Sequence, residues 1–257
     1  MTDLPRILAI HAHPDDVEFQ CAGTLALLKD LGCAITIVTM TAGDCGSAEM
    51  GPLEISKTRR AEAKKAADLL GVDYICLEFK DLSIVVDNDG RRRVTEALRR
   101  TRPNIVLTAP PVDYMSDHEM TSRLVRDACF AAPTPNYDTC QVNPAAALEK
   151  IPHLYYMDSV GGCDLLGNPL EPDFVVDISS KYALKREMLA CHASQRNWLL
   201  RQHGMDEYLH TCDETSSHRG KQIGVQYGEG FRQHVGHPYP ADNLLMKLVG
   251  GVVVKKA

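Results

Sequence analysis

Short apolar runs alternate with longer amphipathic segments in the first half of the chain, and this alternation most constrains the fold. The expected strands are Arg6–Ile10, Ala34–Thr39, Tyr74–Leu77 and Ile105–Ala109. The expected helices cover about Glu18–Leu31, Glu54–Leu70, Arg91–Thr101 and Glu119–Ala131. Such alternation predicts a Rossmann-like α/β fold, with a doubly wound, mostly parallel sheet and helices on both faces.

The second half is less regular. Leu154–Met157 and Phe174–Ile178 are expected strands and Ser180–Gln195 an expected helix, while no clear period follows Arg196. The segment 133–152 is rich in Pro, Asn and Ala and is typical of a long connection. We expect one domain over residues 1–257, with 133–152 and 196–257 forming the rim of a site and setting its specificity.

Composition narrows the class of protein. Hydrophobic residues make up 44% of 257 residues, which suffices for a sizeable core, and a net charge of −6 does not favour nucleic-acid binding. Nine cysteines, an odd number without a C-x-x-C pair, suit free thiols in a reducing compartment. No signal-peptide pattern or membrane-length apolar run is present, so we expect a cytoplasmic protein without a membrane partner.

A dense polar cluster follows the first expected strand. Its sequence is His11-Ala-His13-Pro14-Asp15-Asp16-Val-Glu18. Ligands bind at the carboxyl ends of strands in open α/β sheets, and a His and an Asp three residues apart can ligate one zinc ion. The Asp between them would then be free for proton transfer. Helix capping would explain one of these carboxylates, but not two beside a His and a Pro.

A second loop can complete this cluster. In a doubly wound sheet the strand order reverses between the first and the fourth strand, so the loops that follow them face each other. His118 lies just beyond the fourth strand and can join His13 and Asp16, although taken alone it could simply be the first polar residue of a helix. Two His and one carboxylate are typical of a hydrolytic metal site. This set suits Zn²⁺, and also Fe²⁺ or another divalent metal.

Several short motifs follow one another along the chain. They are Ala12-His13-Pro14-Asp15-Asp16, Gly23-Thr24, Thr41-Ala42-Gly43-Asp44, Arg59 with Glu62, Leu70-Gly71, Asp81 and His192-Ala193-Ser194-Gln195. In this order the motifs resemble the PIG-L/LmbE-like de-N-acetylase family. The match covers Arg6 to about Ala132 well and Ser180–Gln195 more weakly.

The resemblance implies metal-dependent hydrolysis of an N-acetyl amide on an amino sugar, which releases acetate and a free amine. It implies His13, Asp16 and His118 as metal ligands. Asp15 is then the general base that removes a proton from a metal-activated water, whose pKa falls to about 7. Family members often assemble, so the resemblance also allows a homo-oligomer.

The resemblance also implies roles around this centre, each beside a structural alternative. Arg59 and Asp81 would hold the sugar, although Arg59 could instead pair with Glu62 one helical turn away. Asp117 would orient a metal ligand or an arginine, and Asp44 would either support the site or shape a turn. His11 could reach the site or lie buried behind it.

One position departs from the family pattern. The second family signature is His-Pro-Asp-His, whereas this chain has Met115-Ser116-Asp117-His118. The missing His stabilises the oxyanion or assists proton transfer, and Met cannot donate a hydrogen bond. We expect His192 to line the site and take over this catalytic role, although a lone His on a helix is often structural.

Three other functions compete with a deacetylase. An amidase for another acyl group would use the same residues. A non-catalytic sugar-binding relative would explain Met115, but it would not need Asp15. A dinucleotide-dependent oxidoreductase would share the fold class, but G-x-G-x-x-G does not follow the first strand.

Overall fold

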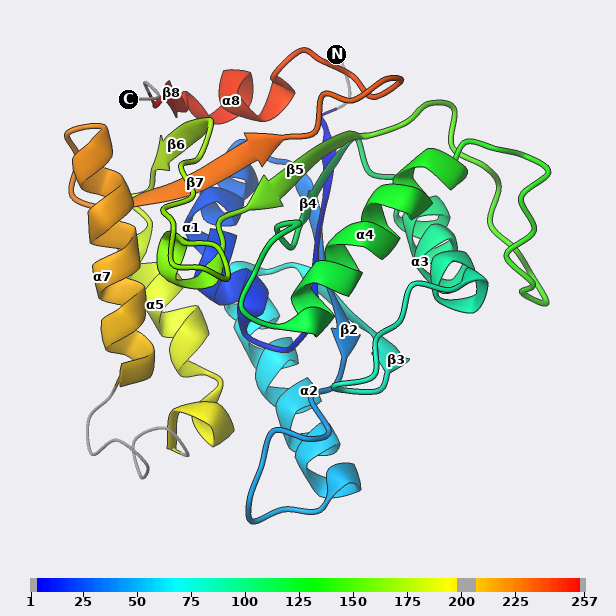
Figure 1. Ribbon diagram of the computed structural model, residues 1–257, viewed down its shortest axis with the longest axis horizontal. Coiled ribbons are helices and arrows are strands. Elements are labelled where there is room, and N and C mark those ends of the chain that lie inside the picture. The colour runs from blue at the N-terminus through cyan, green and yellow to red at the C-terminus, as the bar shows by residue number, and fades with distance from the viewer. Residues whose placement is uncertain (1–3, 198–206, 255–257) are drawn as a thin grey trace.

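The computed structural model describes residues 4–197 and 207–254. Its centre is an eight-stranded sheet, covered by helices on both faces (Figure 1). The strands are β1 Arg6–His11, β2 Ala34–Thr41, β3 Asp73–Phe79, β4 Ile105–Thr108, β5 His153–Met157, β6 Phe174–Asp177, β7 Gly228–Gln233 and β8 Val252–Val253. The helices are α1 Asp16–Asp30, α2 Pro52–Leu70, α3 Asn88–Thr101, α4 Ser116–Ala131, α5 Tyr182–Ala190, α7 Glu207–Gln222 and α8 Leu244–Val249.

The strand order β3-β2-β1-β4-β5-β7-β6-β8 confirms the predicted doubly wound topology. The five strands from β3 to β5 are parallel, and the strand direction changes at β7, which pairs antiparallel with both β5 and β6. The order reverses between β1 and β4, as predicted. A crevice therefore forms beyond the carboxyl ends of these two strands.

Alternate residues of β1 point into two separate cores. Ile7 and Ala9 pack with α1, α2 and α5, whereas Leu8 and Ile10 pack with α3 and α4 on the other face. All four side chains are buried. A strand that is buried on both faces appears in the sequence as a continuous apolar run, which is why the first-half strands could be predicted.

A buried ion pair between Lys185 and Glu229 connects the second half of the chain to the middle of α1. Glu229 of β7 accepts hydrogen bonds from the backbone N–H groups of Gly23 (3.0 Å) and Thr24 (2.7 Å). Lys185 of α5 contacts Glu229 at 2.7 Å and donates to the Phe19 carbonyl at 2.6 Å. A Cβ on Gly23 would lie 2.7 Å from Ile178, so this position requires glycine. The Gly23-Thr24 motif thus joins α1 to the second half of the sheet.

The structure corrects the prediction of one helix over Ser180–Gln195. Helix α5 ends at Ala190, and a new helical segment begins at Ala193. The Ser194 N–H and hydroxyl both donate to Glu62 of α2, at 2.8 Å and 2.7 Å. These bonds satisfy polar groups at the start of the second helical segment, so the helix can be interrupted between Ala190 and Ala193. Beyond residue 206, α7, β7, α8 and β8 were not predicted.

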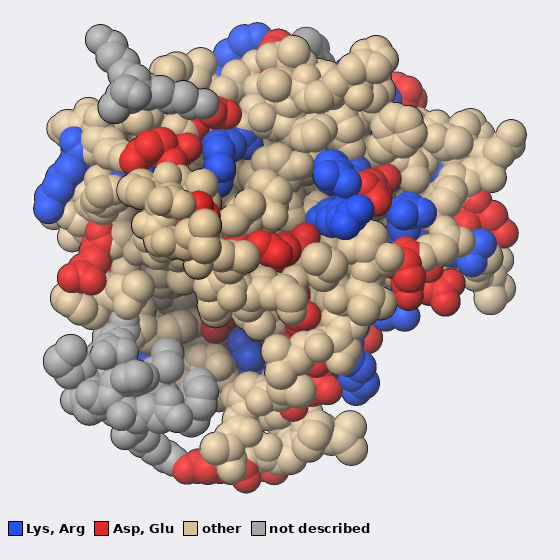
Figure 2. All heavy atoms as spheres, viewed as in Figure 1, with Lys and Arg blue, Asp and Glu red and all other residues tan. Residues whose placement is uncertain are grey.

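No helix within the described residues is long and apolar enough to cross a membrane. The face in Figure 2 carries acidic and basic side chains close together, without a continuous basic surface.

Candidate active site

The predicted site lies on two loops at the carboxyl ends of neighbouring strands. One loop joins β1 to α1 and carries His13, and Asp16 begins the helix. The other joins β4 to α4 and leads to His118 in the first helical turn. Because β1 and β4 pair in parallel, with Ile10 opposite Thr108, both loops leave the same edge of the sheet. The structure therefore brings His13, Asp16 and His118 together.

Asp16 lies between three imidazoles. Its Oδ1 is 3.4 Å from His118 Nε2, and its Oδ2 is 3.4 Å from His13 Nδ1 and 2.7 Å from His11 Nδ1. Burial alone would raise the pKa of Asp16, but the adjacent His11 and His118 hold it well below its usual range. The group is therefore a carboxylate that can bind a cation through either oxygen.

His13 and His118 each contact a second carboxylate on the side of the ring that faces away from Asp16. His118 Nδ1 is 3.1 Å from Asp113 Oδ2, and His13 Nε2 is 3.0 Å from Asp81 Oδ1. A carboxylate only accepts, so these nitrogens carry protons. Burial would lower the pKa of both rings, but the surrounding carboxylates raise it. A cation bound between the rings and Asp16 would displace the protons of the opposite nitrogens. His118 Nε2 is buried without a hydrogen-bond partner among the described residues. Carboxylate–His pairs of this kind orient metal ligands, and the donor set fits a divalent cation.

Two compact groups of potential ligands overlap in this region. In each group the three donor atoms lie within 4.8 Å of one another, and the groups are His11, Asp16, His118 and His13, Asp81, Asp117. His11 is fully buried, and its Nε2 has no hydrogen-bond partner among the described residues. His11 is thus buried behind the site and also contacts Asp16 directly. Asp16 links the two groups.

Asp15 occupies a strained position at the start of α1. Its φ of 107° lies in the left-handed region, which costs a non-glycine residue about 1–3 kcal/mol. Its Oδ2 accepts a 2.7 Å hydrogen bond from the Tyr208 hydroxyl and lies 3.4 Å from Arg59 Nη2. Burial raises the pKa of Asp15, against the opposing effect of Arg59. A carboxylate with a raised pKa beside a cation site is typical of a general base.

Arg59 lies beneath the β1–α1 loop. It is buried, and its Nη2 donates to the Pro14 carbonyl at 2.7 Å. A Cβ on Gly43 would lie 2.3 Å from its Nη1, so this glycine makes room for the guanidinium. The alternative pairing with Glu62 is not formed, since that carboxylate binds Ser194 instead. Arg59 therefore supports the loop that holds Asp15.

Replacing Arg59 by Ala is expected to lower the free energy of unfolding by about 1–3 kcal/mol, because the buried Pro14 carbonyl and Asp15 lose a donor. Urea unfolding of Arg59→Ala measures this loss. The neighbouring Arg60→Ala is the matched control, since Arg60 forms an exposed pair with Glu78 and should change stability little. Unchanged stability of Arg59→Ala together with a raised KM would instead indicate substrate contact.

Asp81 and Asp117 contact His13 on the side away from Asp16, and Asp44 in turn contacts Asp81. Asp81 contacts His13 Nε2, and Asp117 Oδ2 lies 3.4 Å from the same atom. Asp117 also accepts from the Leu82 N–H at 2.8 Å, and Asp44 accepts from the Asp81 N–H at 2.9 Å. The structure thus places Asp81, predicted as a substrate contact, where it can orient His13. Asp117 and Asp44 lie where they can hold this arrangement in place.

His192, predicted to compensate for Met115, is fully buried. Its Nε2 lies 3.6 Å from Glu18 Oε2, and neither ring nitrogen has a hydrogen-bond partner among the described residues. Burial would lower the pKa of His192, but the adjacent Glu18 carboxylate raises it. His192 does not line the cavity described next.

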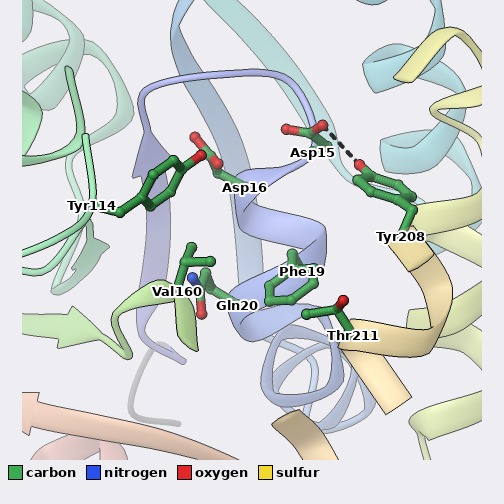
Figure 3. Close-up of a pocket in the computed structure, with 8 residues that line it drawn as sticks. All are labelled: Asp15, Asp16, Phe19, Gln20, Tyr114, Val160, Tyr208 and Thr211. Carbon is green, nitrogen blue, oxygen red and sulfur yellow. Dashed lines mark hydrogen bonds between the residues drawn. The ribbon is translucent and has the colours of Figure 1, made fainter. Parts of the chain in front are cut away.

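A cavity of about 250 Å³ opens beside Asp15 and Asp16 (Figure 3). It is lined by Asp15, Asp16, Phe19, Gln20, Tyr114, Val160, Tyr208 and Thr211. Tyr114 contacts the His118 ring edge to face, with 5.3 Å between the centroids. Aromatic and apolar walls with a few polar groups suit a small organic ligand. No Lys or Arg lies among the described lining residues, and none of these residues comes from 133–152.

Sequence reasoning missed two residues that contact this centre. Asp113 precedes His118 by five residues in the same loop, so its carboxylate could have been predicted as a partner of that histidine. Tyr208 lies 193 residues beyond Asp15, in a helix without a clear apolar period, and nothing in the sequence pointed to it.

Comparison with known proteins gives matches along most of the chain. Residues 8–129 match the family described as PIG-L: GlcNAc-PI de-N-acetylase. The diacetylchitobiose deacetylase of Thermococcus kodakarensis is 29% identical over 239 residues, covering 90% of this chain and 83% of that protein. The solved N,N'-diacetylchitobiose deacetylase from Pyrococcus horikoshii has a TM-score of 0.77 and 26% identity, covering 95% and 92%. The 4-oxalmesaconate hydratase of Pseudomonas putida is 26% identical over 241 residues, covering 88% and 87%.

These matches agree with the motifs and with the fold. The matched segment contains His13, Asp15, Asp16 and His118, which are the residues that meet at the edge of the sheet. The similarity to the deacetylases also extends well beyond this segment into the second half. Residues 8–129 of this chain therefore match the PIG-L de-N-acetylase family, and most of the chain is similar to the diacetylchitobiose deacetylases.

Proposed function

We propose that this protein hydrolyses the N-acetyl amide of an amino sugar in a metal-dependent reaction that yields acetate and a free amine. The observation that carries the proposal is a carboxylate that lines the cavity, Asp15, beside a cluster of two His and one Asp whose ligand atoms lie close together. The similarity to diacetylchitobiose deacetylases along most of the chain supports the class of substrate.

His13, Asp16 and His118 are the ligands we assign to the metal. One nitrogen of His13 and one of His118 lie 3.4 Å from different oxygens of Asp16, and the opposite nitrogen of each ring contacts a second carboxylate that orients it. His11 instead donates to Asp16 from a fully buried position. Zn²⁺ is the first candidate, because two imidazoles and one carboxylate suit it. When bound, such an ion polarises the acyl carbonyl and lowers the pKa of water.

Asp15 performs the proton transfers in this proposal. It accepts a proton from the water that attacks the acetyl carbon. It then returns this proton to the nitrogen as the carbon–nitrogen bond breaks, so the amine leaves neutral. A raised pKa suits both steps, since the carboxylate must take up a proton and release it near neutral pH.

The cavity favours a neutral sugar. Its described walls are aromatic or apolar at Phe19, Tyr114, Val160 and Tyr208, and its charged groups are the two carboxylates of the site. A sugar ring can pack against these walls and bond to Gln20 and Thr211. The second candidate, a hydratase, rests on the similarity to 4-oxalmesaconate hydratase. A polycarboxylate would meet no Lys or Arg among the described lining residues, which disfavours this candidate.

Acetate release tests the proposal. The metal-loaded protein is incubated with diacetylchitobiose, with N-acetylglucosamine and with matched N-propionyl and N-benzoyl amines. We expect acetate and a free amine from the N-acetyl sugars. Release of only the other acids would indicate an amidase of different specificity. Hydration of 4-oxalmesaconate without acetate release would favour the hydratase.

Replacing Met115 by His is expected to raise kcat on N-acetylglucosamine substrates. Met115 caps α4 three residues before His118, where the family signature has His, and its side chain offers no donor. One oxyanion donor contributes about a hundredfold to a thousandfold in optimised sites, so a several-fold gain from the restored donor would be measurable. Met115→Leu is the matched control and should leave kcat unchanged. Equal kcat values for the two variants would mean that this position does not reach the oxyanion.

A further inference from the structure

Both hydrogen bonds to the Asp15 side chain end on the same oxygen. The Tyr208 hydroxyl donates to Oδ2 at 2.7 Å, and Arg59 Nη2 lies 3.4 Å from Oδ2. Among the described residues, no hydrogen bond reaches Oδ1. The two oxygens of a carboxylate are chemically equivalent, and the group can rotate about its last torsion, so a hydrogen bond to one oxygen fixes the plane of the group and leaves the other oxygen facing away. Oδ1 is thus left for the cavity.

Tyr208 is the stronger of the two anchors. Its hydrogen bond is 0.7 Å shorter than the Arg59 contact, the difference between 3.4 Å and 2.7 Å, and the guanidinium is also engaged by the Pro14 carbonyl. In Figure 3 the Tyr208 ring reaches Asp15 from α7 and forms one wall of the cavity. The hydroxyl therefore acts where the reacting atoms of the substrate would lie.

The helix that carries Tyr208 is fixed independently of this bond. Leu209 and Cys212 of α7 are buried and pack with Leu189 of α5. Farther along α7, buried Arg219 contacts Asp158 through two nitrogens, at 2.5 Å and 3.1 Å. Since these contacts hold α7 against the sheet, the Tyr208 hydroxyl is not needed to dock the helix.

We propose that Tyr208 is a positioning residue for catalysis, whose hydroxyl holds Asp15 Oδ2 so that Oδ1 faces the substrate. This inference rests on the proposed role of Asp15 as the base. It assigns a function to a helix outside the segment 8–129 that matches the family. It also explains how the strained backbone of Asp15 can present its carboxylate in a single orientation.

Tyr208→Phe tests the inference in the full, metal-loaded chain, because it keeps the ring and removes only the hydroxyl. We expect kcat on diacetylchitobiose to fall about tenfold to a hundredfold, the range for one buried hydrogen bond to a charged group, with KM changed less than twofold. Tyr182→Phe is the matched control: it removes another Tyr–Asp hydrogen bond to α7, the one to Asp213, outside the cavity. Its kcat should stay at the wild-type value.

A double-mutant cycle separates positioning from general stability. In an Asp15→Asn background, Tyr208→Phe is expected to lower kcat less than twofold, since the base it positions is gone. A tenfold loss in both backgrounds would overturn the inference, and so would a kcat for Tyr208→Phe within twofold of the wild type.

Crystal structures of the metal-free wild type and of Tyr208→Phe give a readout independent of activity. We expect one ordered carboxylate plane for Asp15 in the wild type, and a rotated or disordered carboxylate in the variant. An unchanged Asp15 in Tyr208→Phe would overturn the inference. If the wild type released no acetate, the proposed function would fail, and the crystal structures would still decide what Tyr208 does to Asp15.

Discussion

Asp15→Asn is expected to lower kcat about a hundredfold to ten-thousandfold and to leave the bound metal in place. General base catalysis contributes this much, and an amide cannot take the proton from water. Asn has the same shape as Asp and can keep the contact with Tyr208, so the fold should not change. Asp15 is not among the assigned ligands, which is why metal content should stay at the wild-type value.

Steady-state kinetics together with metal analysis of the same preparations measure both effects. Asp30→Asn is the matched control, because Asp30 lies at the opposite end of α1 and pairs with Lys181 at the surface. A near-normal kcat for Asp15→Asn would mean that another group moves the proton. Loss of metal from this variant would make Asp15 a ligand.

His13→Ala and His118→Ala are each expected to abolish stoichiometric metal binding, because each change removes one of three protein ligands. His11→Ala should still bind one ion, with affinity lowered about tenfold to a hundredfold, since His11 only orients Asp16. Asp113→Asn should behave like His11→Ala, because Asp113 orients His118.

Metal analysis after dialysis against a weak chelator distinguishes these variants, and circular dichroism confirms that each remains folded. A different metal site would give a different result, because His11, Asp16 and His118 also form a compact group of potential ligands. If His11→Ala lost the metal while His13→Ala kept it, that group would be the site and the assignment of His13 would be wrong.

The first half of the fold could be predicted because its strands are buried on both faces. Residues such as Ile7 and Leu8 point into different cores, so each strand appears as an unbroken apolar run between turns. Strand β7 lacks this pattern. It reads Gly228-Glu-Gly-Phe-Arg-Gln, and its buried Glu229 is a charged group whose partners, Lys185 and the α1 backbone, lie far away in sequence.

The site could be predicted where it depends on local order along the chain. His13, Asp15 and Asp16 follow one strand within a few residues, and the strand order brings His118 to them. Tyr208 could not be found in this way, because its place depends on how α7 docks against α5 and the sheet. His192 was expected in the cavity from its motif, whereas in the structure it lies beside Glu18. In the same motif, Ser194 binds Glu62 of α2.

The most direct test of the proposed function is a metal titration of the chelated protein with acetate release from diacetylchitobiose as the readout. We expect no acetate before metal is added, a linear rise of activity with added Zn²⁺, and a plateau at one ion per chain. Acetate release that survives complete removal of metal would contradict the account. So would stoichiometric metal binding without acetate release from any N-acetyl sugar.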